Sequence, residues 1–319
     1  MTENQSVIYK WLIDRPGYFK KNAKFIKSQW PRWTLEDIEI AMKQAKNAFK
    51  TFQTKKLVKD TLQQGSVVKM AKNGIKRLYF DIETSPNVVY SWTIGYNLSI
   101  DYKNIIKERA IICICYKWEH ENKVHSLHWN NGDDYQMIHQ FYKILLEADE
   151  VVGHNSDKFD IKWFKTRCLY HGIRNMPSIT SIDTLKIARK EFKFNSNRLD
   201  YIGQILKVGK KMDTGGFELW KRIIENNDST ALNKMIRYCC NDVLLLEKVF
   251  KKLENYTAAK THAGIVFNKT KDTCPKCGSG NLINNKKRIT ATGVVKQQKQ
   301  CQKCGAYSSF TITKKQNDV

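Results

Sequence analysis

Four acidic residues in apolar or helical segments constrain the fold of this chain more than any other feature. Asp81 and Glu83 lie two residues apart on an expected strand, so both side chains leave the same face. Asp160 starts one helical pattern, and Asp242 shares a helix face with Tyr238 in another. Burying like charges together is costly unless a positive group compensates. A fold that gathers these four carboxylates would therefore be suited to hold two hard divalent cations.

The basic residues are concentrated at the two ends of the chain. The 319 residues include 55 Lys and Arg against 31 Asp and Glu, a formal net charge of +24. Residues 1–76 and residues 256–319 each carry a net +10, whereas residues 77–255 carry only +4. This segmental excess favours a nucleic-acid partner and salt-dependent binding, although excess lysine can also serve solubility alone.

The pattern of apolar residues and the cysteines indicate the cellular compartment in which the protein functions. No apolar run approaches the roughly 18–20 residues of a membrane span, and the polar N-terminal segment lacks a signal-peptide core. We therefore expect no membrane partner and a cytoplasmic location. Nine cysteines in a reducing compartment are more often ligands or core thiols than disulfides. Five lie in apolar or helical stretches and are predicted to be core residues: Cys113, Cys115, Cys168, Cys239 and Cys240.

The N-terminal part, residues 1–52, predicts three short helices. The third begins at Thr34-Leu-Glu-Asp37, a capping-box-like start. Three short helices with a basic last one resemble a helix-turn-helix module, whose final helix would enter a major groove. A small helical domain that packs on its neighbour or binds protein would give the same pattern. Residues 53–76 are expected to form a basic linker.

The middle part, residues 77–255, alternates strands and helices. Strands are predicted at 77–82, 111–118, 124–129, 150–153 and 179–182, and helices at 135–146, 161–171, 198–206, 218–225 and 232–253. A hairpin-rich start followed by β-α-β-α fits a mixed five-stranded sheet with helices on both faces. This is the α/β layout of a ribonuclease H-like domain.

The C-terminal part, residues 270–313, carries two Cys-x2-Cys-Gly pairs with 23 residues between them. Cys274, Cys277, Cys301 and Cys304 predict a tetrahedral site for one structural Zn²⁺, with a redox dithiol as the alternative. The pattern resembles a zinc ribbon. Its basic hairpin residues are expected to contact nucleic acid or, alternatively, a protein: Lys286, Lys287, Arg288, Lys296 and Lys299.

The three acidic segments together resemble the three motifs of the DEDD exonuclease superfamily, which includes the proofreading exonucleases of DNA polymerases. Asp81-Ile-Glu83 matches Asp-x-Glu, the segment 155–160 matches Asn-x3-Phe-Asp, and the segment 238–242 matches Tyr-x3-Asp. The last match indicates the tyrosine subclass (DEDDy), because Arg237 stands where the other subclass has histidine. The resemblance covers about residues 77–255.

The resemblance implies a metal-dependent 3′–5′ exonuclease that releases 5′-mononucleotides. Asp81, Glu83, Asp160 and Asp242 would hold two Mg²⁺ or Mn²⁺, and Tyr238 would orient the attacking water. With an ordinary pKa near 10, a tyrosine is a poor general base at neutral pH, so positioning is the safer role.

Five further residues are candidate substrate contacts: His154, Asn155, Phe159, Lys210 and Lys211. His154 and Asn155 could instead hold a turn, and the two lysines could be ordinary surface charges. Asp183 is expected to cap a helix. Phe217 and Trp220 are expected in the core rather than stacked on a base.

The resemblance leaves partner and substrate open. It favours DNA over RNA, with a polymerase or replication or recombination proteins as possible partners. The domain layout more loosely resembles proteins of bacteriophage genomes, which would place the chain in the host cytoplasm. An RNA-processing exonuclease and a non-catalytic DNA-binding or assembly protein are the alternatives. A structure-selective endonuclease or transposase is disfavoured by Tyr-x3-Asp.

Overall fold

The computed structural model describes residues 2–13, 23–29, 31–45, 74–95 and 97–312. The chain divides into two compact units, residues 1–69 and residues 70–319, and each is described by itself. Most of the expected linker, residues 53–73, lies outside the described residues, as do residues 46–52 of the expected helical part and residue 313 of the expected zinc ribbon.

The N-terminal unit contains α1 (Glu3–Ile13), α2 (Ala23–Gln29) and a third helical stretch over residues 35–45. Ile8, Leu12, Ile26 and Ile38 are fully buried and join these helices in one small core. The N-cap bond of the predicted capping-box-like start is present: the Asp37 amide donates to Thr34 Oγ1 (3.1 Å), and the Thr34 hydroxyl in turn donates to Asp37 Oδ2 (2.8 Å). Whether this unit binds DNA or protein stays a prediction.

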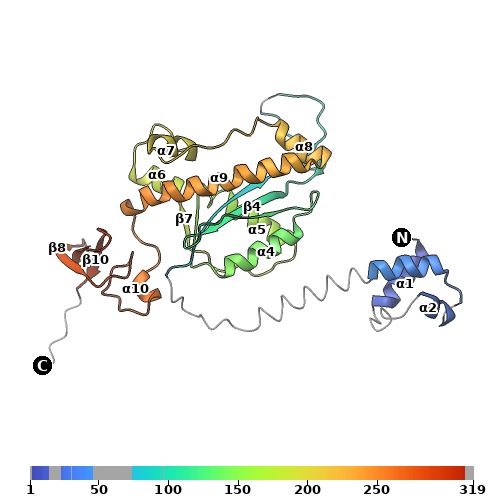
Figure 1. Cartoon of the computed structure of the whole chain (residues 1–319), viewed down its shortest axis with the longest axis horizontal. Helices are drawn as coiled ribbons and strands as arrows, with labels where there is room; N and C mark the ends of the chain where they lie inside the picture. The colour runs from blue at the N-terminus through green and yellow to red at the C-terminus, as the bar shows by residue number, and fades with distance from the viewer. Residues whose placement is uncertain (1, 14–22, 30, 46–73, 96, 313–319) are drawn as a thin grey trace. The chain divides into compact units, whose positions relative to one another are not determined.

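The second unit is built on a mixed five-stranded sheet (Figure 1). The strand order is β5 (His125–His128), β4 (Ile111–Trp118), β1 (Arg77–Thr84), β6 (Glu150–Gly153) and β7 (Ser181–Asp183). Central strand β1 pairs antiparallel with β4 and parallel with β6. The predicted ribonuclease H-like α/β fold class is thus confirmed, and strands 111–118 and 150–153 have the predicted ends.

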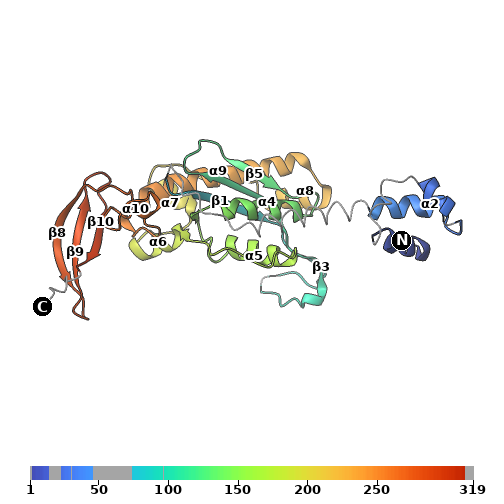
Figure 2. The ribbon, with the colours of Figure 1, turned by 90° about the horizontal axis from the view of Figure 1, so that it is seen from below.

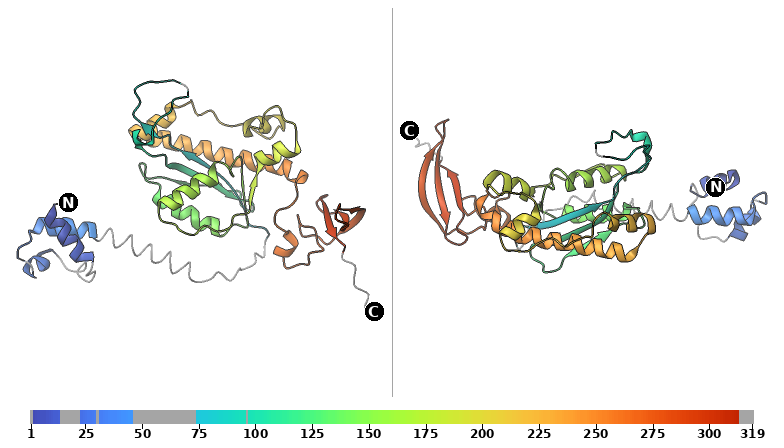
Figure 3. Two further views of the ribbon diagram at one scale, coloured as in Figure 1. Left: turned by 180° about the vertical axis from the view of Figure 1, so that it is seen from behind. Right: turned by 90° about the horizontal axis from the view of Figure 1, so that it is seen from above.

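Helices cover both faces of this sheet (Figures 1 and 3). They are α4 (Tyr135–Leu146), α5 (Asp160–Tyr170), α6 (Thr184–Glu191), α7 (Leu199–Ile205), α8 (Glu218–Asn226) and α9 (Ser229–Leu253). Neighbouring residues of β1 meet opposite layers: Tyr79 packs on Phe250 of α9 (6.1 Å between ring centroids), and Phe80 packs on Phe141 of α4 (5.6 Å). The alternation places Asp81 and Glu83 on the α9 side.

Two features within residues 77–253 were not predicted from the sequence. Helix α6 is short and rich in lysine and arginine, so its apolar stripe is weak. Its start is set by Asp183, whose carboxylate accepts the Leu185 amide (2.9 Å), and this confirms the predicted N-cap. The other is an excursion between β1 and β4, where β2 (Val88–Val89) pairs with β3 (Ile105–Lys107) beside the short 3₁₀ helix η2 (Tyr102–Asn104).

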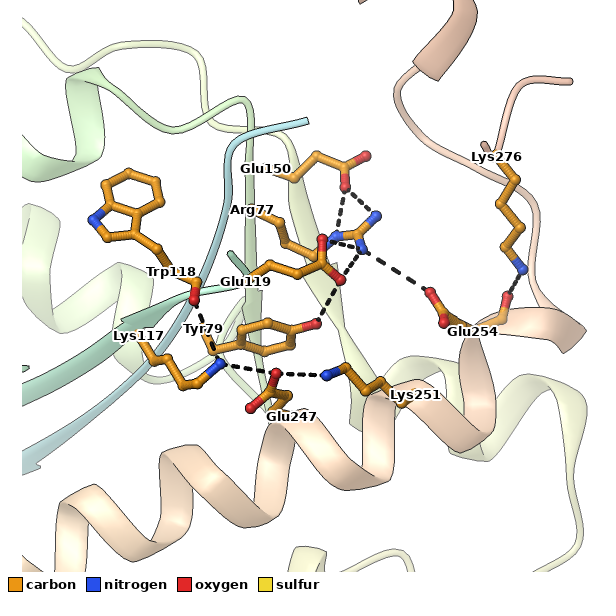
Figure 4. Close-up of polar contacts among 10 residues, drawn as sticks. All are labelled: Arg77, Tyr79, Lys117, Trp118, Glu119, Glu150, Glu247, Lys251, Glu254 and Lys276. Atoms are coloured by element: carbon orange, nitrogen blue, oxygen red, sulfur yellow. Dashed lines mark hydrogen bonds and ion pairs between the residues drawn. The ribbon is translucent and has the colours of Figure 1, made fainter. Parts of the chain in front are cut away.

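Buried ion pairs fix α9 and β1 in the sheet (Figure 4). Lys117 of β4 donates to Glu247 Oε1 of α9 (2.9 Å), and both side chains are nearly buried. Arg77, at the start of β1, lies 2.9 Å from both Glu119 and Glu150. Since α9 also carries Tyr238 and Asp242, the Lys117–Glu247 pair helps set the position of these residues relative to β1.

The C-terminal part of this unit follows η3 (Glu254–Tyr256) and α10 (Ala263–Val266). It is a three-stranded antiparallel sheet, ordered β10 (Tyr307–Thr311), β9 (Val295–Cys301) and β8 (Leu282–Ile289) (Figure 2). Gly293 turns the chain between β8 and β9 with φ of +80°, a conformation that favours glycine. In the described part of the chain, no helix combines the length and apolar character needed to cross a bilayer.

The Lys117–Glu247 pair predicts a large stability effect. Replacing Glu247 by alanine leaves the buried Lys117 ammonium without its carboxylate, which costs about 3–5 kcal/mol. The measurement is the free energy of unfolding from guanidinium titration of the full chain. The matched control is Glu191→Ala, which removes an exposed pair with Lys190 and should cost less than about 1 kcal/mol. If Glu247→Ala and Glu191→Ala lowered the free energy of unfolding equally, the Lys117–Glu247 pair would not have the stabilising role assigned to it.

Candidate active site and metal centres

Three of the predicted acids meet in one cluster. Asp81 and Glu83 approach it from β1, and Asp242 approaches it from α9. Carboxylate oxygens of the three lie within 4.8 Å of one another. Asp242 is 1% exposed, whereas Asp81 and Glu83 are half-buried, so the cluster lies between sheet and helix and remains partly open to solvent. Asp242 is thus brought to residues that precede it by 161 and 159 positions in the sequence.

The fourth acid, Asp160, borders this cluster without joining it. Asp160 begins α5, is 3% exposed, and its Oδ1 accepts the backbone N–H of Ile82 (3.2 Å). Its charge contributes to raising the pKa of Asp81, so the two carboxyl groups are electrostatic neighbours. The structure therefore brings three acids together and holds the fourth beside them by a hydrogen bond to β1.

The cluster is short of positive charge. Burial, and then the charges of neighbouring groups, raises the pKa of Asp81 well above its usual value. The same causes raise the pKa of Glu83 to about 8, and burial raises that of Asp160 to about 7. Burial also raises the pKa of Asp242, although Lys211 opposes this effect. The fold thus holds these four carboxyl groups close together, where a bound cation would stabilise their ionised forms.

Lys211 supplies a positive charge at the cluster. Its Nζ donates to Asp242 Oδ2 (2.6 Å) and to the Tyr238 hydroxyl (3.1 Å). Burial alone would lower the pKa of Lys211, but the charge of Asp242 raises it above its ordinary value. Tyr238 lies on the Asp242 face of α9, and burial followed by the charge of Asp242 raises its pKa to about 12. The phenol therefore keeps its proton at neutral pH.

The donor set fits hard divalent cations. Asp242 Oδ1 is buried and has no hydrogen-bond partner among the described residues, which is costly for a carboxylate oxygen. Oxygen ligands from carboxylates are those that Mg²⁺ and Mn²⁺ prefer. The converging oxygens of Asp81, Glu83 and Asp242, with Asp160 beside them, are consistent with such a site.

The remaining predicted substrate contacts lie around this cluster. The ring nitrogens of His154 are 2.9 Å from Thr184 Oγ1 and 3.0 Å from the Asn197 carbonyl, and burial lowers its pKa to about 4. Asn155 adopts a φ of +64° and its amide donates to Asp183 Oδ1 (2.9 Å), so both residues hold the turn before α5. Phe159 is half-buried against the core, and Lys210 is exposed. Substrate contact by these four stays a prediction.

Some neighbours of the site were missed or misjudged. Cys239 lies beneath Asp81, with its Sγ 3.4 Å from the Asp81 carbonyl oxygen, and it is buried with Cys113 and Cys115 as predicted for core thiols. Trp220 is half-buried and its Nε1 donates to the Thr84 carbonyl (3.1 Å). Phe217 was wrongly expected in the core: it is 58% exposed, because it precedes the first turn of α8 instead of lying on its apolar stripe.

The four C-terminal cysteines form a second candidate centre. Their Sγ atoms lie within 4.8 Å of one another, with separations of 3.7 Å for Cys274–Cys304 and 3.6 Å for Cys277–Cys301. Sulfurs bonded at 2.3 Å to a tetrahedral Zn²⁺ would be about 3.8 Å apart, so the thiols are already close to ligand geometry.

The two knuckles that carry these cysteines follow the same backbone pattern. Gly278 and Gly305 have φ of +67° and +75°, and their amides donate to the carbonyls of Cys274 and Cys301 (2.8 Å each). Burial opposes ionisation of Cys301, but the amides of Cys304 and Lys303 help lower its pKa to about 7. Thiolate ligands and turned backbone amides suit structural zinc.

Comparison with known proteins gives a family match. A family model described as RNase_H superfamily matches residues 78–254. No curated protein matches the sequence. Among solved structures, the family B DNA polymerase from the hyperthermophilic archaeon Pyrobaculum calidifontis is similar at 19% identity and a TM-score of 0.44. The similarity covers 57% of this chain and 25% of the polymerase chain, so the chain spans about a quarter of that protein.

The four-thiol centre predicts bound zinc. Metal analysis of the purified full chain should give about one zinc ion per chain. Cys301→Ser should lose that zinc, because it removes a ligand, whereas Cys168→Ser in the core should retain it. Zinc retained by Cys301→Ser, or absent from the parent, would count against the centre.

Proposed function

The chain belongs to the RNase H superfamily, and on that premise we propose that it is a metal-dependent 3′–5′ exonuclease of the tyrosine DEDD type. The convergence of Asp81, Glu83 and Asp242 beside Asp160 is the observation that carries this proposal. The substrate class that fits is nucleic acid, because both flanks of the acidic core are strongly basic, and the resemblance to proofreading exonucleases favours DNA over RNA. The products would be 5′-mononucleotides.

The four acids would hold two divalent cations. Bound there, Mg²⁺ or Mn²⁺ would supply a water of lowered pKa and would stabilise charge on the leaving oxygen. The protein's own contribution is preorganisation: β1 fixes Asp81 and Glu83, the Ile82 amide fixes Asp160, and α9 fixes Asp242. Because these positions are set by folding, little reorganisation is needed when substrate binds.

Tyr238 and Lys211 would complete the site. The Tyr238 hydroxyl keeps its proton and would hold the attacking water by a hydrogen bond. The Lys211 ammonium holds Asp242 through Oδ2, which leaves Oδ1 for a cation. The Lys211 side chain is one-third exposed, so it can also reach a substrate phosphate at the mouth of the site.

The C-terminal sheet would tether the nucleic acid. Lys286, Lys287 and Arg288 follow one another on β8, and all three side chains are exposed. Because successive strand residues alternate faces, Lys287 and Arg288 leave opposite faces of β8, so the strand can offer cations to phosphates on either face without competing with the acid cluster for charge.

The acid site predicts loss of cleavage with retained binding. Asp81→Ala and Asp242→Asn should each lower the rate by at least about a thousandfold, because each removes several kcal/mol of charge stabilisation. Tyr238→Phe should be milder. The measurement is release of mononucleotides from end-labelled single- and double-stranded DNA and RNA, with Mg²⁺, Mn²⁺ or EDTA.

The matched control is Asp157→Asn, because Asp157 pairs with Lys186 and lies three residues before Asp160. It should cleave within a fewfold of the parent. Parental cleavage by Asp242→Asn would refute the site assignment. Internal nicks would indicate an endonuclease, binding without turnover a non-catalytic protein, and turnover of RNA alone an RNA-processing enzyme.

The β8 cations predict weaker, less salt-dependent binding. Combined Lys286→Gln, Lys287→Gln and Arg288→Gln should lower DNA affinity and reduce the slope of log K against log salt by about 0.9 for each lost phosphate contact. The control removes the same charge from exposed helix positions of the core by Lys143→Gln, Lys162→Gln and Lys165→Gln. If both triple variants lose DNA affinity equally, the loss follows from the lower net charge of the protein, and β8 is not a specific DNA-binding element.

A further inference from the structure

The excursion between β1 and β4, residues 86–109, exposes large apolar side chains to solvent. Trp92 is 101% exposed, Ile94 98%, Tyr102 76% and Tyr90 74%. Seven of the 24 exposed large hydrophobic side chains among the described residues lie in this one segment. Exposed apolar groups gathered in this way mark a binding surface, because single scattered ones are the rule elsewhere.

The segment is held by local hydrogen bonds. Its base is the β2–β3 ribbon, and Asp101 caps η2 by accepting the Lys103 amide (2.9 Å). The Ser91 hydroxyl donates to the Thr93 carbonyl (2.6 Å) on either side of Trp92. In Figures 1 and 2 the segment is the cyan loop that stands clear of the helical layers. The Trp92 side chain is thus presented from a stem that the protein itself fixes.

The neck of this segment adjoins the acid cluster. The Ser85 amide donates to the Ala110 carbonyl (2.9 Å), and the Ala110 amide donates back to Ser85 Oγ (3.0 Å). Glu83 lies two residues before this closure, on the same strand. A ligand that lies on the excursion and continues past its neck would therefore reach the carboxylates.

The chemistry of the segment suits nucleobases. Flat aromatic rings stack on bases, and each such contact is worth about 1–3 kcal/mol. Tyr90, Trp92 and Ile94 alternate with Ser91 and Thr93, so the surface is aromatic and hydroxyl-rich rather than a continuous aliphatic patch. Cations lie towards its base: Lys103, Lys107 and Arg109, of which Arg109 Nε is buried without a hydrogen-bond partner among the described residues.

We propose that residues 86–95 and 97–109 form a stacking platform that binds the unpaired bases of the strand entering the acid cluster, with Trp92 as its main stacking ring. This proposal rests on the proposed nuclease function and narrows its substrate class. Bases inside a duplex hide their faces in the stack, so only a single strand or a frayed end offers faces to Trp92. The protein therefore prefers single-stranded ends.

The test is binding of fluorescein-labelled DNA, followed by anisotropy without added Mg²⁺ or Mn²⁺ so that no cleavage occurs and the zinc ion is retained. Trp92→Ala should weaken binding of a mixed-sequence single strand about 5- to 100-fold and leave binding of a blunt duplex nearly unchanged. Trp92→Phe should retain most of the affinity. Trp92→Leu, which keeps apolar surface without a ring, should resemble alanine. The control is Tyr256→Ala, which removes an exposed aromatic side chain in η3, after the C-terminal end of α9.

A second binding measurement uses an abasic single strand, which has the same phosphates but lacks the bases. The parent should bind it more weakly than the normal strand, and Trp92→Ala should bind both strands alike. These binding measurements need no catalysis. Failure of the platform proposal can therefore be distinguished from failure of the proposed nuclease function.

Three outcomes would overturn the platform. The first is that Trp92→Ala binds the single strand as the parent does. The second is that Trp92→Leu binds it as well as Trp92→Phe, which would indicate simple apolar docking. The third is that Trp92→Ala abolishes a self-association seen by sedimentation, which would assign the surface to a second copy of the chain.

Discussion

Close approach of buried like charges is the constraint on which this structure depends. Asp81, Glu83 and Asp242 share one cluster with Asp160 beside them, and Lys211 contributes one ammonium group to it. A core that holds such a cluster must be fixed by other interactions, since the cluster itself opposes folding in the absence of cations. The Lys117–Glu247 pair and the Arg77 contacts supply part of that restraint, on the same strands and helix that carry the acids. The Arg77 contacts and the acid cluster thus lie at opposite ends of β1.

The two candidate metal centres differ in the softness of their ligands. The acid cluster offers carboxylate oxygens, which suit Mg²⁺ or Mn²⁺, and the C-terminal knuckles offer four sulfurs, which suit Zn²⁺. This division would let one chain hold a catalytic metal ion and a structural one without exchange between the two centres. It also separates charge: the carboxylates lie in the nearly neutral middle of the chain, and the cations that attract a polyanion lie mainly in its flanks.

Sequence patterns predicted most helices and strands of the second unit, because these elements are long or strongly apolar. The helix at 135–146 and the strands at 111–118 and 150–153 carry continuous apolar stripes, and their ends came out as predicted. Helix α6 was missed because its stripe is brief and its start depends on one capping carboxylate, Asp183. The β2–β3 ribbon was missed for a different reason: its strands have only two and three residues, too few to show an alternating pattern.

The sequence by itself determined the chemistry available: which acids, which thiols, and in what order along the chain. Spacing alone placed Asp81 with Glu83 and Tyr238 with Asp242, because strand and helix periods are fixed by backbone geometry. Only the tertiary structure decided that β1 and α9 meet, that Asp160 binds the Ile82 amide beside the other acids, and that Lys211 turns its ammonium onto Asp242. Those contacts join residues 31 to 161 positions apart, and no local preference encodes such distances; they follow from how the sheet and its helices bury their apolar faces together.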